Sequence, residues 1–136
     1  MPALDSVVFA KTHADGRAPS VVSNGLWTLK FPANVSAGNC LPKTNQTIDL
    51  LQTVSIPIGY IGIIAPLNGD NVSGQANLFV NTRVILGSGT PVQLKLQCIN
   101  LDTVARSIIE NTDAAILAIV KQDEFKTDTS AGTWHP

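Results

Sequence analysis

No stretch of this chain repeats its apolar residues every three to four positions over the length of a helix. Apolar residues come instead in short, β-branched runs that glycine, proline, asparagine and aspartate interrupt, a pattern typical of β-sandwiches and β-barrels. The clearest run, Val92–Asn100, alternates between apolar and polar residues. Its two faces carry different side chains: Val92, Leu94, Leu96 and Cys98 on one, and Gln93, Lys95 and Gln97 on the other. The sequence therefore predicts an all-β fold.

We expect one jelly-roll-like β-sandwich. Its strands are predicted at Ser6–Lys11, Leu26–Phe31, Thr47–Ser55, Gly62–Pro66, Ala76–Phe79, Val84–Leu86, Val92–Asn100, Arg106–Ile109 and Ala115–Lys121. The segment Ala114–Val120 lacks alternation, which predicts a strand covered on both faces, in the core or at a subunit contact. The residues expected to be buried are Val54, Ile56, Leu94, Leu96, Cys98, Ile116 and Ile119.

The length of 136 residues is that of a single domain. We place its core at about residues 20–122, between a polar N-terminal arm (1–19) and a polar C-terminal arm (123–136). Aromatic side chains in these arms are candidates for anchoring in a partner, because large aromatic residues are common at the centres of protein interfaces. The predicted partner-binding residues are Phe9, Phe125 and Trp134.

Charge excludes several kinds of partner. Nine basic and ten acidic side chains give a net charge of −1, which predicts no nucleic-acid or anionic-membrane binding. The longest apolar run, Ile56–Leu67, is interrupted by prolines and glycines, so we expect no membrane span. Charged residues make up only 14% of the chain, against about 25% in average domains. The low charge predicts that other subunits cover part of the surface.

The sequence offers no local set of metal ligands. Cys40 and Cys98 lie far apart in the sequence, which excludes a CxxC arrangement and leaves open either one disulfide or two buried thiols. The two histidines, His13 and His135, lack ligand spacing to each other or to the cysteines. The segment Gly87–Thr90 lacks the lysine and helix of a phosphate-binding loop, and it predicts a hairpin turn. We therefore predict no metal and no cofactor.

The most specific string is Val54–Pro66, which reads Val-Ser-Ile-Pro-Ile-Gly-Tyr-Ile-Gly-Ile-Ile-Ala-Pro. It resembles the strand–turn–strand of the trimeric dUTPase family, with the pattern Val-x-[Ile/Val]-Pro-x-Gly-Tyr-x-Gly-x-[Ile/Leu]-x-Pro. Downstream, Val92–Asp102 is similar to a long strand and turn of that family, and Ile109–Ile119 to its closing strand. The resemblance covers about residues 25–123 and implies a dUTPase-like jelly roll that assembles as a homotrimer.

The same resemblance indicates that the family's active-site side chains are replaced. Its chemistry needs a general-base Asp, Asp residues that hold Mg²⁺ with the triphosphate, and a uracil hairpin with a Tyr. The family strings Ala-Gly-x-Asp-Leu, Pro-Arg-Ser, Gly-x-Ile-Asp-x-x-Tyr-x-Gly and Gly-Asp-Arg-Ile-Ala-Gln correspond here to Asn24–Leu29, Pro66–Asn68, Val84–Pro91 and Asn111–Ile116. The Arg- and Gly-rich C-terminal arm has no counterpart in Lys126–Pro136. This comparison predicts a chain that is not an enzyme and has no catalytic residues.

The predicted function is therefore a non-enzymatic, dUTPase-fold homotrimer of viral origin that decorates or cements a capsid and resides in the virion. One alternative is a viral adaptor derived from a dUTPase that acts in the host cytoplasm or nucleus. Its PDZ-binding version is disfavoured, because Gly132–Pro136 supplies no terminal apolar residue. A second alternative is a divergent, active dUTP pyrophosphatase. A third is an unrelated sugar- or surface-binding module, which the scarcity of aromatic residues disfavours.

Overall fold

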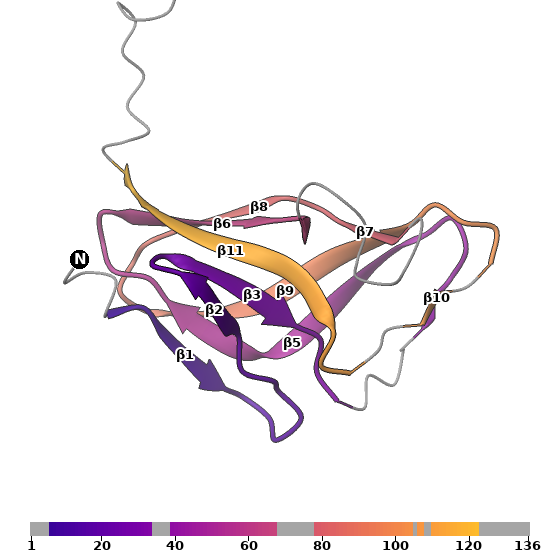
Figure 1. Ribbon diagram of the computed structural model, residues 1–136, viewed down its shortest axis with the longest axis horizontal. Helices are drawn as coiled ribbons and strands as arrows, with labels where there is room; N and C mark the ends of the chain where they lie inside the picture. Colours follow the sequence, from indigo (N-terminus) through magenta and orange to yellow (C-terminus); the bar gives the residue numbers. More distant parts are fainter. Residues whose placement is uncertain (1–5, 34–38, 68–77, 105, 108–109, 123–136) are drawn as a thin grey trace, which may run out of the picture.

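The computed structural model describes residues 6–33, 39–67, 78–104, 106–107 and 110–122. In these ranges every regular element is a β-strand, and two antiparallel sheets pack face to face in a sandwich (Figure 1). The predicted all-β sandwich is confirmed. No helical segment of the described ranges has the length and apolarity of a membrane span.

The first sheet has four strands in the order β1-β5-β9-β7. Their bounds are Val8–Lys11 for β1, Asn45–Ser55 for β5, Pro91–Asn100 for β9 and Leu78–Val80 for β7. The long strands β5 and β9 form its centre, and both alternate between buried and less buried residues. From Val92 to Cys98 the apolar residues of β9 face the core and the polar ones face outward, as the sequence predicted, although Val92 is only half-buried. At the end of the strand this order reverses, because the polar Asn100 is fully buried.

The second sheet has five strands in the order β2-β3-β11-β6-β8. Their bounds are Ser20–Ser23 for β2, Leu26–Lys30 for β3, Asp113–Lys121 for β11, Tyr60–Ala65 for β6 and Arg83–Leu86 for β8. A separate two-stranded pairing joins β4 (Asn39–Cys40) to β10 (Arg106–Ser107). The chain therefore changes sheets between β7 and β8.

Each of the nine predicted strands overlaps an observed one, and two observed strands, β2 and β4, had no prediction. Strand β2 is short and exposed along its whole length, so it carries no apolar face to detect. Strand β1 lies within the predicted N-terminal arm and pairs with β5 from Val8 to Lys11. The division into core and arms stays a prediction, and Phe125 and Trp134 lie outside the described residues.

The core fills the space between the sheets with aliphatic side chains. Its fully buried members include Leu29, Phe31, Leu50, Ile64, Leu94 and Leu117. Six of the seven residues expected to be buried are buried, and Ile116 is the exception. That prediction was wrong because β11 alternates: Ala115, Leu117 and Ile119 point into the core, which turns Ile116 to the outer face.

Two turns brace each other at one end of the sandwich. The Gly87 amide donates to the Tyr60 carbonyl at 2.8 Å, and the Gly89 amide donates to the Ile56 carbonyl at 2.8 Å. A Cβ added at Gly87 would overlap the carbonyl oxygens of Pro57 and Tyr60, whereas one at Gly89 would meet open space. Gly87 therefore permits a close backbone approach.

We expect Gly87→Ala to lower the free energy of unfolding by about 3 kcal/mol, because backbone atoms must shift to relieve the overlap. Gly89→Ala is the matched control. Gly89 has a φ of 75°, and a Cβ there would meet no atom within 4 Å. Gly89→Ala should therefore lower the free energy of unfolding by only about 1 kcal/mol, the cost of a left-handed backbone conformation at a non-glycine residue. Urea unfolding followed by circular dichroism measures both, and equal losses would contradict the close approach.

Candidate functional site

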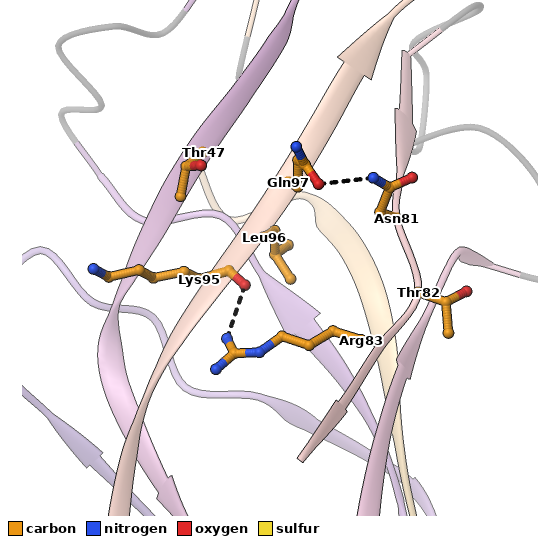
Figure 2. A pocket seen from close by; sticks show the side chains of 7 residues that line it. All are labelled: Thr47, Asn81, Thr82, Arg83, Lys95, Leu96 and Gln97. Carbon is orange, nitrogen blue, oxygen red and sulfur yellow. Dashed lines mark hydrogen bonds between the residues drawn. The ribbon is translucent and has the colours of Figure 1, made fainter.

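A pocket opens where the chain changes sheets. Strand β7 pairs with β9 up to Val80 opposite Cys98, and β8 pairs instead with β6 from Arg83 onward. From Gln97 back toward Pro91, no described strand pairs with β9 on that side. The opening has a volume of about 330 Å³, and Figure 2 shows its lining residues: Thr47, Asn81, Thr82, Arg83, Lys95, Leu96 and Gln97.

Side chains cap this open edge of β9. Arg83 Nη1 donates to the carbonyl oxygens of Lys95 at 3.2 Å and Gln93 at 3.4 Å. The backbone N–H of Asn81 donates to the backbone carbonyl oxygen of Gln97 at 3.0 Å. The side chains of the two residues also meet, because Asn81 Nδ2 donates to Gln97 Oε1 at 2.8 Å. Because strand-edge carbonyls need hydrogen-bond partners, these contacts fix the wall of the pocket.

The charges that line the pocket are positive. Arg83 comes from β8 and Lys95 from the outward face of β9, and no carboxylate is among the lining residues. In Figure 2 the Arg83 guanidinium lies against β9, while the Lys95 side chain reaches across toward β5. The hydroxyl groups of Thr47 and Thr82 add uncharged donors. The arrangement can hold an anionic group that accepts several hydrogen bonds.

A carboxylate lies beside the pocket in a strained part of β5. Asp49 lies opposite Lys95 in the register of β5 and β9. Its Oδ1 accepts hydrogen bonds from Gln93 Nε2 at 2.7 Å and from the Leu51 backbone amide at 2.8 Å. Leu51 has a φ of 59°, and the β5–β9 register shifts between Asp49 and Thr53. Non-glycine residues with this φ are strained and recur at functional sites. Asp49 is therefore part of the candidate site.

Among the residues predicted to bind partners, only Phe9 is described. Its ring packs edge-on against Trp27 with ring centroids 5.4 Å apart, which ties β1 to β3. Phe9 does not line the pocket. The pocket itself was missed, because it results from the sheet change after β7, which leaves no signal in the local residue pattern. The outward direction of Lys95 and Gln97 was the part that alternation did predict.

The dUTPase resemblance implies aspartates that hold Mg²⁺ with the triphosphate. Within the described ranges, no group of three or more His, Cys, Asp or Glu side chains is placed to hold a metal ion. The described residues therefore do not fit Mg²⁺ as a resident cofactor.

No protein-family model matches the sequence, and no curated protein matches it. Solved structures do match. The dUTPase of Staphylococcus bacteriophage 80alpha has a TM-score of 0.70 at 16% identity, over 97% of this chain and 93% of the phage protein. A point mutant of that phage enzyme also scores 0.70, at 18% identity, over 85% and 89%. The dUTPase from phage phi11 of S. aureus scores 0.67 at 18% identity, over 96% and 92%.

These structures correct the sequence analysis on one point. The replaced motifs predicted a chain that is not an enzyme. That prediction is contradicted, because the solved structures reported above, which match most of this chain, are those of phage dUTPases. The family named from the string Val54–Pro66 is the one that the solved structures support. The chain has the dUTPase-like fold.

Proposed function

We propose that this protein is a divergent dUTP pyrophosphatase. The reaction adds water across the bond between the α- and β-phosphates of dUTP and releases dUMP and pyrophosphate. The observation that carries the proposal is the likeness to phage dUTPases, which extends over 97% of this chain in the case of the 80alpha enzyme. Fold alone does not fix an activity, so the pocket supplies the second support.

The pocket lies next to a segment that the resemblance relates to substrate binding, although none of that segment's residues lines it. The resemblance assigns the uracil hairpin to Val84–Pro91, which runs from within β8, through the turn at Gly87–Thr90, to the first residue of β9. Arg83 directly precedes this segment and Lys95 follows it on β9, and both line the pocket. Ligand pockets commonly combine a concave shape with a few polar groups, and this opening is concave and lined mostly by polar residues.

Asp49 is our candidate for the residue that orients the attacking water. Its two hydrogen bonds, from Gln93 Nε2 and the Leu51 amide, fix the carboxylate on the same outward face that carries Thr47 and Lys95. A carboxylate held in this way is able to accept a proton from water. In this proposal Asp49 takes the role of the general-base Asp of the family motifs, which the corresponding string Val84–Pro91 of this chain lacks.

Incubation of the purified chain with dUTP and Mg²⁺ should release dUMP and pyrophosphate, and dCTP should be a poorer substrate. Asp49→Asn should lower kcat about 100-fold, because general-base catalysis contributes at least that factor. Glu110→Gln is the control, since Glu110 pairs with Arg17 and does not line the pocket. No pyrophosphate above the uncatalysed rate would contradict the proposed activity.

We also infer that the protein assembles as a homotrimer, as the dUTPase resemblance implies. The outer face of the five-stranded sheet supports assembly. On three neighbouring strands, β11, β6 and β8, its outward side chains are apolar: Ile116, Ala118, Val120, Ile63, Ala65, Val84 and Leu86. Val84 and Leu86 are 57% and 65% exposed. A contiguous apolar face of this kind is typical of a subunit contact.

Light scattering at micromolar concentration should give three times the chain mass of 14.4 kDa. Ile63→Asp should shift the protein toward monomers, because burying an unpaired carboxylate at the contact is unfavourable. Val104→Asp, at an exposed loop position, should leave the mass unchanged. A wild-type protein with the mass of one chain would contradict the trimer.

Viral origin is part of the proposal, because the comparison structures come from phages. Attachment to a capsid protein and residence in the virion stay predictions. Of the three residues assigned to that attachment, Phe9 is half-buried and packs on Trp27, so only part of its ring is available to a partner.

A further inference from the structure

We propose that Lys95 and Arg83 bind the phosphate groups of the ligand directly, in place of a metal ion held by carboxylates. The identity of the ligand as a nucleotide rests on the proposed function. The phosphate chemistry does not, because it follows from the charges and the shape of the pocket.

Two cations from different strands line this opening, and none of its lining residues is acidic. A guanidinium has five N–H donors in a fixed plane. The hydrogen bonds from Arg83 to β9 are made by Nη1, and they hold the side chain against the edge of that strand. Arg83 is therefore a positioned cation at the wall of the pocket.

Lys95 supplies a second, more adaptable charge. Its side chain is exposed and extends over β5 beside Thr47 (Figure 2). The carboxylate that faces it from β5 is Asp49, whose Oδ1 already accepts hydrogen bonds from Gln93 and from the Leu51 amide. Among the described residues, the Lys95 ammonium group forms no ion pair with Asp49 or with another carboxylate. Lys95 is therefore available to an incoming phosphate.

The size and the uncharged donors fit the same ligand. A volume of about 330 Å³ lies at the lower end of the range for small-molecule pockets, about 300–1,000 Å³. That space suits a phosphate chain. The hydroxyl groups of Thr47 and Thr82 and the side-chain amide of Gln97 add hydrogen-bond donors around it.

The described ranges contain no cluster of metal-ligating side chains. The property that distinguishes the proposed site is therefore phosphate binding without a metal ion. If carboxylate-held Mg²⁺ bridged the phosphates, EDTA would abolish binding. If Lys95 and Arg83 carry the charge, binding should persist in EDTA and should weaken as salt rises, because salt screens exposed charges.

Isothermal titration calorimetry of the full chain in EDTA tests this proposal, with inorganic pyrophosphate, dUTP and deoxyuridine as separate ligands. Pyrophosphate and dUTP should bind, and Lys95→Gln should weaken both about tenfold, the loss expected for one charge-assisted hydrogen bond. Lys95→Arg should retain most of the affinity. Lys121→Gln, at the end of β11 in the other sheet, should change nothing.

Each outcome separates this inference from the proposed activity. Pyrophosphate binding in EDTA that depends on Lys95, without dUTP turnover, would retain the phosphate site and reject the pyrophosphatase. Turnover with binding that Lys95→Gln does not alter would reject the phosphate site and retain the enzyme. Binding that occurs only with Mg²⁺ would also overturn the inference. Tighter binding of deoxyuridine than of pyrophosphate would assign the pocket to the nucleoside and overturn it as well.

Discussion

A carbonyl group at the edge of a β-sheet needs a hydrogen-bond donor, and at β9 an arginine provides it. After Val80 the chain leaves the four-stranded sheet, so in the part of the chain that the structure describes no strand pairs with this side of β9 from Gln97 back to Gln93. Arg83 donates to two of the exposed carbonyl groups, and Asn81 to a third. The open edge therefore becomes the wall of a pocket, and Arg83, which satisfies two of its carbonyl groups, also gives the pocket one of its two positive charges.

The two outer faces of the sandwich differ in chemistry. The four-stranded sheet turns polar side chains outward, among them Thr47, Asp49 and Lys95, next to the pocket. The five-stranded sheet turns aliphatic side chains outward along β11, β6 and β8. The apolar outer face accounts for part of the low charge of the chain. In the proposed trimer, packing through this face would leave the polar face accessible.

Local pattern predicted the strands well where one face was apolar and the other polar. Alternation placed the side chains of β9 from Gln93 to Cys98 correctly, because a period of two fixes the face of each residue. In β11 both faces are apolar, so the pattern carried no information on direction, and Ile116 was expected to be buried although it lies half-buried on the outer face. Strand β2 gave no signal because none of its residues is buried.

The site was harder to predict than the fold. Arg83 and Lys95 come together because of a change of sheet, which depends on long-range pairing of β8 with β6. The bulge that places Asp49 depends on a φ of 59° at Leu51, a residue type that does not favour that conformation. Motif comparison found the family's side chains replaced, and a comparison of strings carries no information on residues elsewhere in the chain.

The central claim is that this pocket holds a nucleotide. The most direct test is to follow backbone amide resonances by nuclear magnetic resonance while dUTP is added to the isotope-labelled protein. The account predicts saturable shift changes at the residues around the pocket, Thr47, Thr82, Arg83, Lys95 and Gln97. Shift changes confined to the outer face of the five-stranded sheet, or none at all at saturating dUTP, would contradict it.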